Sequence, residues 1–127
     1  MILAIIDDDE INHFIIKRMI NKISDKIIIH SFYEVEKGLD FIHTNETQLA
    51  NLPQIIFLDI NMPGLDGWYF IEHLEKMQYK LYNPDIYMVS SSVHQKDLDK
   101  AKSSGYIKKY LTKPISQQTL NDILEKG

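Results

Sequence analysis

The chain of 127 residues contains no cysteine, which excludes a disulfide framework and a thiolate metal site and agrees with a reducing compartment. It also lacks a long hydrophobic run, since the apolar stretch over residues 1–6 has no cationic flank and is too short for a signal peptide or a membrane span. An excess of positive charge is missing as well: the formal charge is −4, and nonspecific nucleic-acid binding requires a positive field. We therefore expect a cytoplasmic protein that binds neither a membrane nor a nucleic acid.

Internal repeats, low-complexity segments and linkers are absent from the sequence too. A chain of this length fits one domain, which buries roughly two-thirds of its unfolded surface. Because the last helical pattern runs to the end of the chain, we expect a single domain over residues 1–127 with no output domain.

Short apolar runs alternate with stretches that carry apolar residues at helical spacing. The expected strands are Ile2–Ile6, Ile27–Phe32, Ile55–Leu58, Ile86–Val89 and Ile107–Leu111. The expected helices are Glu10–Lys22, Glu34–Thr44, Gly67–Met77, Gln95–Ser104 and Ser116–Lys126, the last with Ser116 as its N-cap. Parallel neighbours need crossover connections, so the alternation predicts an α/β fold whose parallel sheet has helices on both faces.

Asp59 directly follows the third apolar run and precedes the loop sequence Asn61-Met62-Pro63-Gly64. The pattern predicts a buried strand whose carboxyl end delivers one acid into a loop, at the edge where open α/β sheets bind ligands. Taken alone, Asp59 is equally compatible with opening a turn.

Further acids follow the first strand, at Asp7 and Asp8, and they approach Asp59 if the first and third strands are neighbours. Two unit charges about 4 Å apart repel by roughly 4 kcal/mol at an effective dielectric near 20. Three such carboxylates need a cation or a raised pKa, and their oxygen ligands suit Mg²⁺. In isolation, the acid pair is also compatible with a solvated turn or a helix N-terminus.

The fourth strand ends at Ser90-Ser91-Ser92 and the fifth at Thr112-Lys113-Pro114. A hydroxyl and an ammonium at this edge supply the donor and the positive charge that a phosphoryl group on Asp59 requires. Each motif alone is common in loops and at strand ends, but here four strands end in residue types that one reaction needs.

Together these segments resemble the receiver domain of two-component response regulators. The matching segments are Asp7–Asp8, Phe57–Gly67, Met88–Ser91 and Tyr110–Pro114. They occur in the family's order over the whole chain, and the Asp-x-x-Met-Pro-x-x-Asp-Gly motif combined with Lys-Pro is highly specific. The resemblance implies a stand-alone, flavodoxin-like (βα)5 domain with strand order 2-1-3-4-5. It also implies a phosphoryl donor, either a histidine kinase or a histidine phosphotransfer protein.

The resemblance further implies roles for the residues at the strand ends. Asp59 is the phosphoacceptor, Asp8 a direct Mg²⁺ ligand, Asp7 its acidic companion, and the backbone carbonyl of Asn61 a further ligand. Asp9 lies outside the metal shell, as a loop residue or cap.

Lys113 is expected to pair with the phosphoryl oxygens, next to a Lys113–Pro114 bond that is often cis in this family. Ser90 matches the switch hydroxyl and Tyr110 the switch aromatic residue. The expected readout is the surface formed by the fourth helix, the fifth strand and the fifth helix, which would bind an unknown downstream protein.

Two positions depart from the family pattern. Gly105 lies eight positions before Lys113, one more than usual, which predicts that the fifth strand either carries a bulge or starts differently. The same departure leaves open whether Tyr106 or Tyr110 is the switch, and the usual spacing of Tyr110 to Lys113 favours Tyr110. Ser92, at a position that tunes dephosphorylation in the family, does not reveal the lifetime of the phosphoryl group.

The first helix carries an apolar sector spanning roughly 240° at about 100° per residue, wider than packing on one sheet face requires. We hypothesise that part of it, Ile11 and Ile15, docks the helical phosphodonor; the alternative is a helix buried more deeply than usual.

We expect no enzymatic activity beyond the chain's own Mg²⁺-dependent phosphorylation and dephosphorylation. We also expect the chain to be a monomer or a weak homodimer. Two other classes remain open. A phosphohydrolase of the haloacid dehalogenase type would have a second acid at the position of Asn61, and it would also have a cap domain, for which this chain is too short. A pseudo-receiver, which binds partners without phosphorylation, would lack a site residue, and none is missing.

Overall fold

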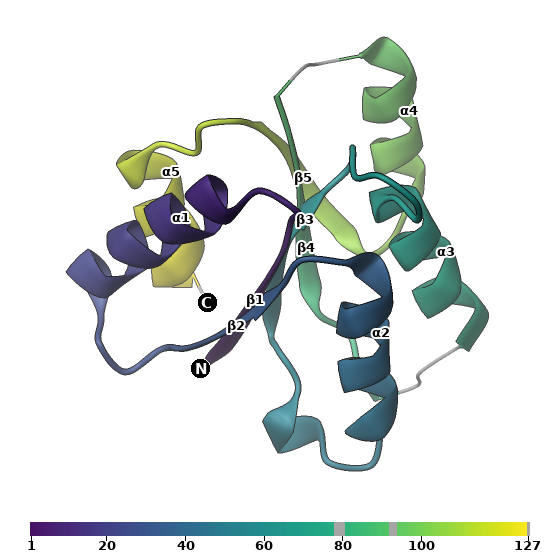
Figure 1. Cartoon of the computed structure of the whole chain (residues 1–127), viewed down its shortest axis with the longest axis horizontal. Coiled ribbons are helices and arrows are strands. Elements are labelled where there is room, and N and C mark those ends of the chain that lie inside the picture. The colour runs from purple at the N-terminus through teal and green to yellow at the C-terminus, as the bar shows by residue number, and fades with distance from the viewer. Residues whose placement is uncertain (78–80, 92–93, 127) are drawn as a thin grey trace.

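A computed structural model describes residues 1–77, 81–91 and 94–126 of the chain. Its five strands form one parallel sheet in the order β2-β1-β3-β4-β5, which confirms the predicted topology (Figure 1). The strands are β1 (Ile2–Ile6), β2 (Ile28–Phe32), β3 (Ile55–Asp59), β4 (Asp85–Ser90) and β5 (Ile107–Thr112). The helices are α1 (Glu10–Ile23), α2 (Val35–Thr44), the short 3-10 helix η1 (Leu49–Asn51), α3 (Gly67–Met77), α4 (Gln95–Ser103) and α5 (Gln117–Lys126).

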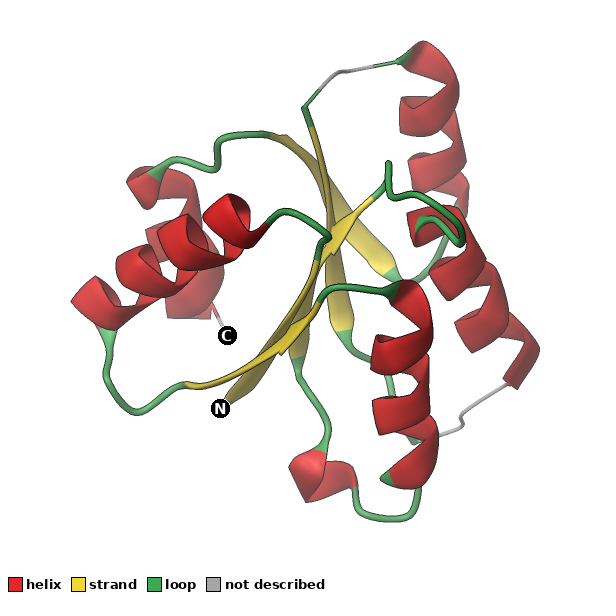
Figure 2. Cartoon of the chain, in the orientation of Figure 1, coloured by secondary structure: helices red, strands yellow, loops and turns green. Residues whose placement is uncertain are grey.

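Helices cover both faces of the sheet, as the alternating pattern predicted. Helices α1 and α5 lie together on one face, and α2, α3 and α4 lie on the other (Figures 1 and 2). Each face has its own apolar cluster: Ile5 and Phe57 point toward α1 and α5, whereas Ile6 and Leu58 point toward α2 and α3. Strand β3 is buried over its whole length because it lies at the centre of the sheet. That position places the end of β3 between the ends of its two neighbours.

The observed boundaries differ from the expected ones by at most one residue at an end. Hydrogen bonds of the parallel ladder extend β3 through Asp59 and β4 through Ser90, so both residues belong to strands rather than to loops. The Ser116 Oγ accepts a hydrogen bond from the Thr119 amide at 3.1 Å, which confirms Ser116 as the N-cap of α5. Helix η1 was not predicted, because three residues are too few to show a periodicity.

The predicted bulge in β5 is confirmed. Ile86 pairs with Ile107 but Tyr87 pairs with Lys109, so Lys108 is one residue too many for regular pairing. Ile107 and Tyr110 both pack against the cluster on the α4 side, although residues three apart in a regular strand point to opposite faces. The extra residue restores the register and keeps both side chains on the same face.

Among the described residues, no helix combines the length and the apolar character needed to cross a lipid bilayer.

Candidate functional site

The predicted acids meet at the carboxyl edge of the sheet. Ile6 of β1 pairs with Leu58 of β3, so the residues that follow them, Asp7 and Asp59, lie side by side. One carboxylate oxygen from each of Asp7, Asp8 and Asp59 lies within 4.8 Å of the others. Asp7 and Asp59 are buried, whereas Asp8 is exposed at the mouth of the site. The structure therefore brings together the three carboxylates that the sequence placed at strand ends.

Lys113 reaches the same cluster from the end of β5. Its Nζ lies 2.8 Å from Asp7 Oδ2 and 3.2 Å from Asp59 Oδ2, forming an ion pair with both acids. The Lys113 amide also donates to the Ser90 carbonyl oxygen at 2.8 Å, which fixes the backbone of Lys113 beside the end of β4. The Lys113–Pro114 peptide bond is cis, as the resemblance implies. One ammonium thus offsets part of the charge of two buried carboxylates.

Burial, and after it the neighbouring Asp7 charge, raise the pKa of Asp59 to about 6, although Lys113 and the Asn61 amide act in the opposite direction. Burial alone would lower the pKa of Lys113, but its hydrogen bond to Asp7 and the charges of Asp7 and Asp59 outweigh that effect and raise it. The acids therefore favour the charged form of Lys113. One ammonium does not neutralise the three carboxylates, so the site still favours binding of a cation.

The cluster fits a hard divalent cation. Its donors are carboxylate oxygens without nitrogen or sulfur, and Mg²⁺ prefers such ligands while retaining several waters. Asp7, Asp8 and Asp59 would hold the ion. The Asn61 carbonyl as a further ligand stays a prediction.

Asn61 connects the acids to the end of β4. Its backbone amide donates to Asp59 Oδ1 at 3.1 Å, and its side-chain Nδ2 donates to the Ser90 Oγ at 3.2 Å. Ser90 is fully buried, so its hydroxyl lies inside the site rather than on the loop surface. The predicted switch hydroxyl is thus joined through one side chain to the predicted phosphoacceptor.

The structure places both candidates for the aromatic switch, Tyr106 and Tyr110, in similar surroundings. Tyr106 and Tyr110 are both partly buried, and both pack against the cluster on the α4 side of the sheet. The preference for Tyr110 therefore stays a prediction. Ser92 lies outside the described residues.

Gly67, at the start of α3, lies against the backbone of Asp59. A Cβ atom at this position would lie 2.5 Å from the Asp59 carbonyl oxygen and 3.1 Å from the Ile60 Cα. Because backbone atoms cannot move aside as a flexible side chain can, a larger residue here would displace Asp59. The glycine of the Asp-x-x-Met-Pro-x-x-Asp-Gly motif therefore has a steric function.

Sequence reasoning did not identify Asn12 and His13. Both are buried, and both reach from the first turn of α1 to Asp7: Asn12 Nδ2 donates to Asp7 Oδ2 at 2.7 Å, and His13 Nε2 lies 2.7 Å from the Asp7 carbonyl oxygen. A signal was present, since Asn12 precedes Ile16 and Ile20 at four-residue spacing and so lies on the buried face of α1. A polar residue on that face, next to an acid cluster, indicates a partner within the site.

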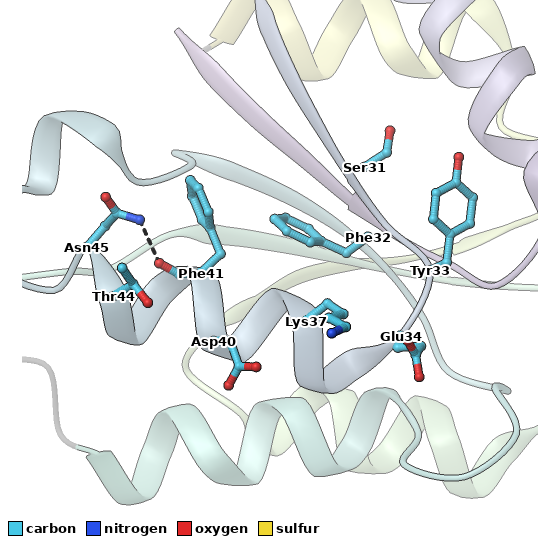
Figure 3. Close-up of a pocket in the computed structure, with 9 residues that line it drawn as sticks. All are labelled: Ser31, Phe32, Tyr33, Glu34, Lys37, Asp40, Phe41, Thr44 and Asn45. Carbon is cyan, nitrogen blue, oxygen red and sulfur yellow. Dashed lines mark hydrogen bonds between the residues drawn. The ribbon is translucent and has the colours of Figure 1, made fainter.

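A pocket of about 580 Å³ lies elsewhere, beside β2 and α2 (Figure 3). Phe32, Lys37 and Phe41 contribute to its lining, and Asn45 donates a hydrogen bond to the Phe41 carbonyl oxygen at 2.8 Å along its rim. Its lining does not include Asp7, Asp8, Asp59, Ser90 or Lys113. The candidate site is therefore the acid cluster at the carboxyl edge of the sheet.

Comparison with known proteins gives matches over almost the whole chain. The family model described as response regulator receiver domain matches residues 3–125. The nitrate/nitrite response regulator protein NarL of Escherichia coli K12 is 27% identical over 125 residues, which make up 98% of this chain and 53% of NarL. The sensor histidine kinase CheAY of Helicobacter pylori is 26% identical over 126 residues, 99% of this chain but 15% of CheAY. This chain thus corresponds to only part of each of these two relatives.

Among solved structures, a two-component response regulator from Cytophaga hutchinsonii superposes with a TM-score of 0.86 and 28% identity, covering 98% of this chain and 94% of that one. A two-component response regulator from Legionella pneumophila gives a TM-score of 0.81 and 25% identity, and 98% of each chain is covered.

Proposed function

Because this chain belongs to the response regulator receiver domain family, we propose that it is the phosphoacceptor of a two-component system and carries the phosphoryl group on Asp59. The observation that carries the proposal is the ion pair of Lys113 with both Asp7 and Asp59 at the carboxyl edge of the sheet. A turn-forming aspartate would not need a partly buried ammonium, a second buried acid and a motif glycine packed against its own backbone.

In the proposed reaction, a carboxylate oxygen of Asp59 attacks the phosphorus of the donor. A new oxygen–phosphorus bond forms, the bond between phosphorus and the donor atom breaks, and the leaving group takes the electron pair. Such transfers have a loose transition state that depends mainly on positioning and on charge compensation at the equatorial oxygens. Lys113 supplies one positive charge for those oxygens, and Mg²⁺ held by the three acids would supply more.

The phosphoryl group would then change the contacts of Ser90 and Lys113. It adds negative charge and acceptor oxygens next to a buried hydroxyl that Asn61 holds at 3.2 Å. A state in which Ser90 and Lys113 bind the new oxygens differs in its contacts from the unphosphorylated state, which shifts the population between the two. We propose Ser90 and Tyr110 as the switch residues and the α4-β5-α5 surface as the readout for an unidentified protein partner.

The proposed phosphodonor is a histidine kinase or a histidine phosphotransfer protein in the cytoplasm. Two-component proteins among the relatives support this class of donor. Helix α1 offers it a surface: Ile11 is 68% exposed and Phe14 is 61% exposed, in the first turns of the helix that follows Asp7 and Asp8. These exposed side chains favour the docking hypothesis over a deeply buried helix. We propose no reaction for the chain beyond its own phosphorylation and dephosphorylation.

Acetyl phosphate with Mg²⁺ tests the proposal, with intact-mass spectrometry as the readout. We expect a phosphoryl adduct on the wild-type chain and none on Asp59→Asn. The matched control is Asp9→Asn: Asp9 belongs to the same acidic run, but its side chain accepts the Ile11 amide at 2.9 Å as the N-cap of α1. Asparagine caps a helix as well as aspartate does, so this variant should form the adduct.

The remaining outcomes separate the rival functions. An adduct that persists in Asp59→Asn would refute the assigned nucleophile. Continuous hydrolysis of small phosphate esters would indicate a phosphohydrolase. A wild-type chain that forms no adduct with any small phosphodonor would indicate a pseudo-receiver.

A further inference from the structure

The Asp7 carboxylate accepts hydrogen bonds from other groups in addition to its ion pair with Lys113. Its carboxylate is almost completely buried, with 1% of the residue exposed. Oδ1 accepts the Asp9 amide at 2.9 Å, while Oδ2 accepts both the Asn12 Nδ2 at 2.7 Å and the Lys113 Nζ at 2.8 Å. One oxygen thus has two side-chain donors, an ammonium from β5 and a neutral amide from α1.

We propose that Asn12 is a positioning residue, which keeps the Asp7 carboxylate in place for cation binding and leaves Lys113 able to move onto the phosphoryl group. This inference rests on the proposed function of Asp59. The side-chain hydrogen bond of Asn12 goes to Asp7 and not to Asp59, so Asn12 acts through Asp7.

The need for a second donor follows from the double use of Lys113. In the unphosphorylated chain its Nζ lies 2.8 Å from Asp7 and 3.2 Å from Asp59. Once Asp59 carries a phosphoryl group, the same ammonium must face the new oxygens, which weakens its contact with Asp7. A buried carboxylate oxygen that loses its partner is costly, and its free energy would oppose the movement. Asn12 removes that penalty because its amide stays on Oδ2.

Asn12 is well suited to this role because two hydrogen bonds, made by Asp9 and by His13, fix the first turn of α1. The Asp9 side chain caps the turn by accepting the Ile11 amide. His13 fixes it from within: its Nε2 lies 2.7 Å from the Asp7 carbonyl oxygen, and since a carbonyl can only accept, Nε2 carries the proton and donates. The first turn of α1 therefore holds Asp7 by its main chain through His13 and by its side chain through Asn12.

Asn12→Leu tests the role, because leucine fills a similar volume but donates no hydrogen bond. The two readouts are the Mg²⁺ dissociation constant by calorimetry and the rate constant of phosphorylation by acetyl phosphate at saturating Mg²⁺. We expect Mg²⁺ binding to weaken by about 10-fold or more, the usual effect of removing an outer partner of a metal ligand. We also expect slower phosphorylation at saturating Mg²⁺, because Lys113 then remains the main side-chain donor to Asp7.

Two controls separate this role from general destabilisation. Ile16→Val trims a buried side chain one helical turn further along α1, so it should lower the melting temperature without changing either readout. Asn51→Leu removes a side-chain hydrogen bond of the same 2.7 Å length, from Asn51 Nδ2 to Gln48, on η1 and away from the acids. It should leave both readouts at the wild-type value.

Asn12→Ser provides a second test, since it also removes the amide and is expected to fold if leucine is not tolerated. A folded variant at this position with the wild-type Mg²⁺ affinity and the wild-type rate constant would overturn the inference. If the wild-type chain itself forms no adduct, the proposed function fails. The comparison of Mg²⁺ affinities then still decides whether Asn12 positions Asp7.

Discussion

At the scale of single residues, Asp59 combines burial with a close negative neighbour. It is 5% exposed and lies beside a second buried acid, so the Asp59 carboxylate is less well solvated in the folded protein than it is in the unfolded chain. Lys113 compensates only partly, because its Nζ is also shared with Asp7. Both a proton and a cation relieve the same excess of negative charge.

This excess predicts a pH-dependent stability in the presence of a metal chelator. The pKa of Asp59 is raised by burial and by Asp7 to about 6 from its ordinary value of 3.8. A group whose pKa is raised on folding favours the folded state below the unfolded pKa, and this contribution is lost as the pH rises through the folded pKa. Asp59→Asn should therefore raise the free energy of unfolding by about 2 kcal/mol at pH 7, and the gain should vanish as the pH falls from 6 to 4.

Urea denaturation at several pH values, with chelator present, measures this difference. Lys113→Met is the opposite control: it removes the compensating charge, so it should lower the stability at pH 7. An Asp59→Asn variant that is equally stabilised at pH 4 and at pH 7 would show that desolvation of the carboxylate is not the cause.

At the scale of elements, helix α1 has a buried face, which carries Asn12, Ile16 and Ile20, and an exposed face next to the site. Ile16 and Ile20 are buried against the sheet, Asn12 holds Asp7, and Ile11 projects into solvent. The wide apolar sector in the sequence therefore does not make one deep core face. Part of it is left uncovered next to the site.

The docking hypothesis for that uncovered part predicts an effect of Ile15→Ala on phosphotransfer. Ile15 is 38% exposed in the first half of α1, and Ile23 is 36% exposed at the opposite end of the same helix. The pair forms a matched test, since both truncations remove the same atoms from similarly exposed positions. We expect Ile15→Ala to slow phosphotransfer from the cognate kinase by about 5-fold, which corresponds to roughly 1 kcal/mol of lost interface contact. Ile23→Ala should have no effect.

Phosphorylation by acetyl phosphate serves as the internal reference in this experiment, because it requires no docking. It should stay at the wild-type rate in both variants. Unchanged transfer from the kinase to a stably folded Ile15→Ala variant would remove the docking hypothesis.

The bulge in β5 shows how far an element can be predicted from its length. The spacing from Gly105 to Lys113 indicated one residue too many, and the structure confirms an irregular step in the pairing with β4. The identity of the extra residue did not follow from the spacing. It depends on packing, since Ile107 and Tyr110 both have to face the core cluster on the α4 side.

At the scale of the whole molecule, the topology brings distant segments to one edge. Residues from the ends of β1, β3, β4 and β5 converge there, because parallel strands all present their carboxyl ends on the same side. A cation bound at this edge would therefore stabilise the fold as a unit, by connecting segments that are far apart in the chain.

We predict that Mg²⁺ raises the melting temperature of the wild-type chain. At 100 times the dissociation constant, a ligand specific for the folded state contributes about 2.7 kcal/mol, or roughly 5–10 °C for a domain of this size. Asp8→Asn should lose most of this shift in differential scanning fluorimetry. Asp25→Asn, which removes an exposed acid after the far end of α1, should keep it. Equal shifts in the two variants would mean that Mg²⁺ acts on the overall charge rather than at the acid cluster.

The sequence by itself determined the order of strands and helices and the residues that end each strand. Both depend on local patterns. Apolar runs mark strands and helical spacing marks helices, and Asp7, Asp8, Asp59, Ser90 and Lys113 lie at or just after the ends of the apolar runs. The tertiary structure decided what these patterns cannot encode. It shows that Asn12 holds Asp7, that Gly67 must leave room for the Asp59 carbonyl, and that Ile11 stays uncovered. The physical reason is that these features depend on distances and burial between segments, which are fixed only when the sheet and its helices pack together.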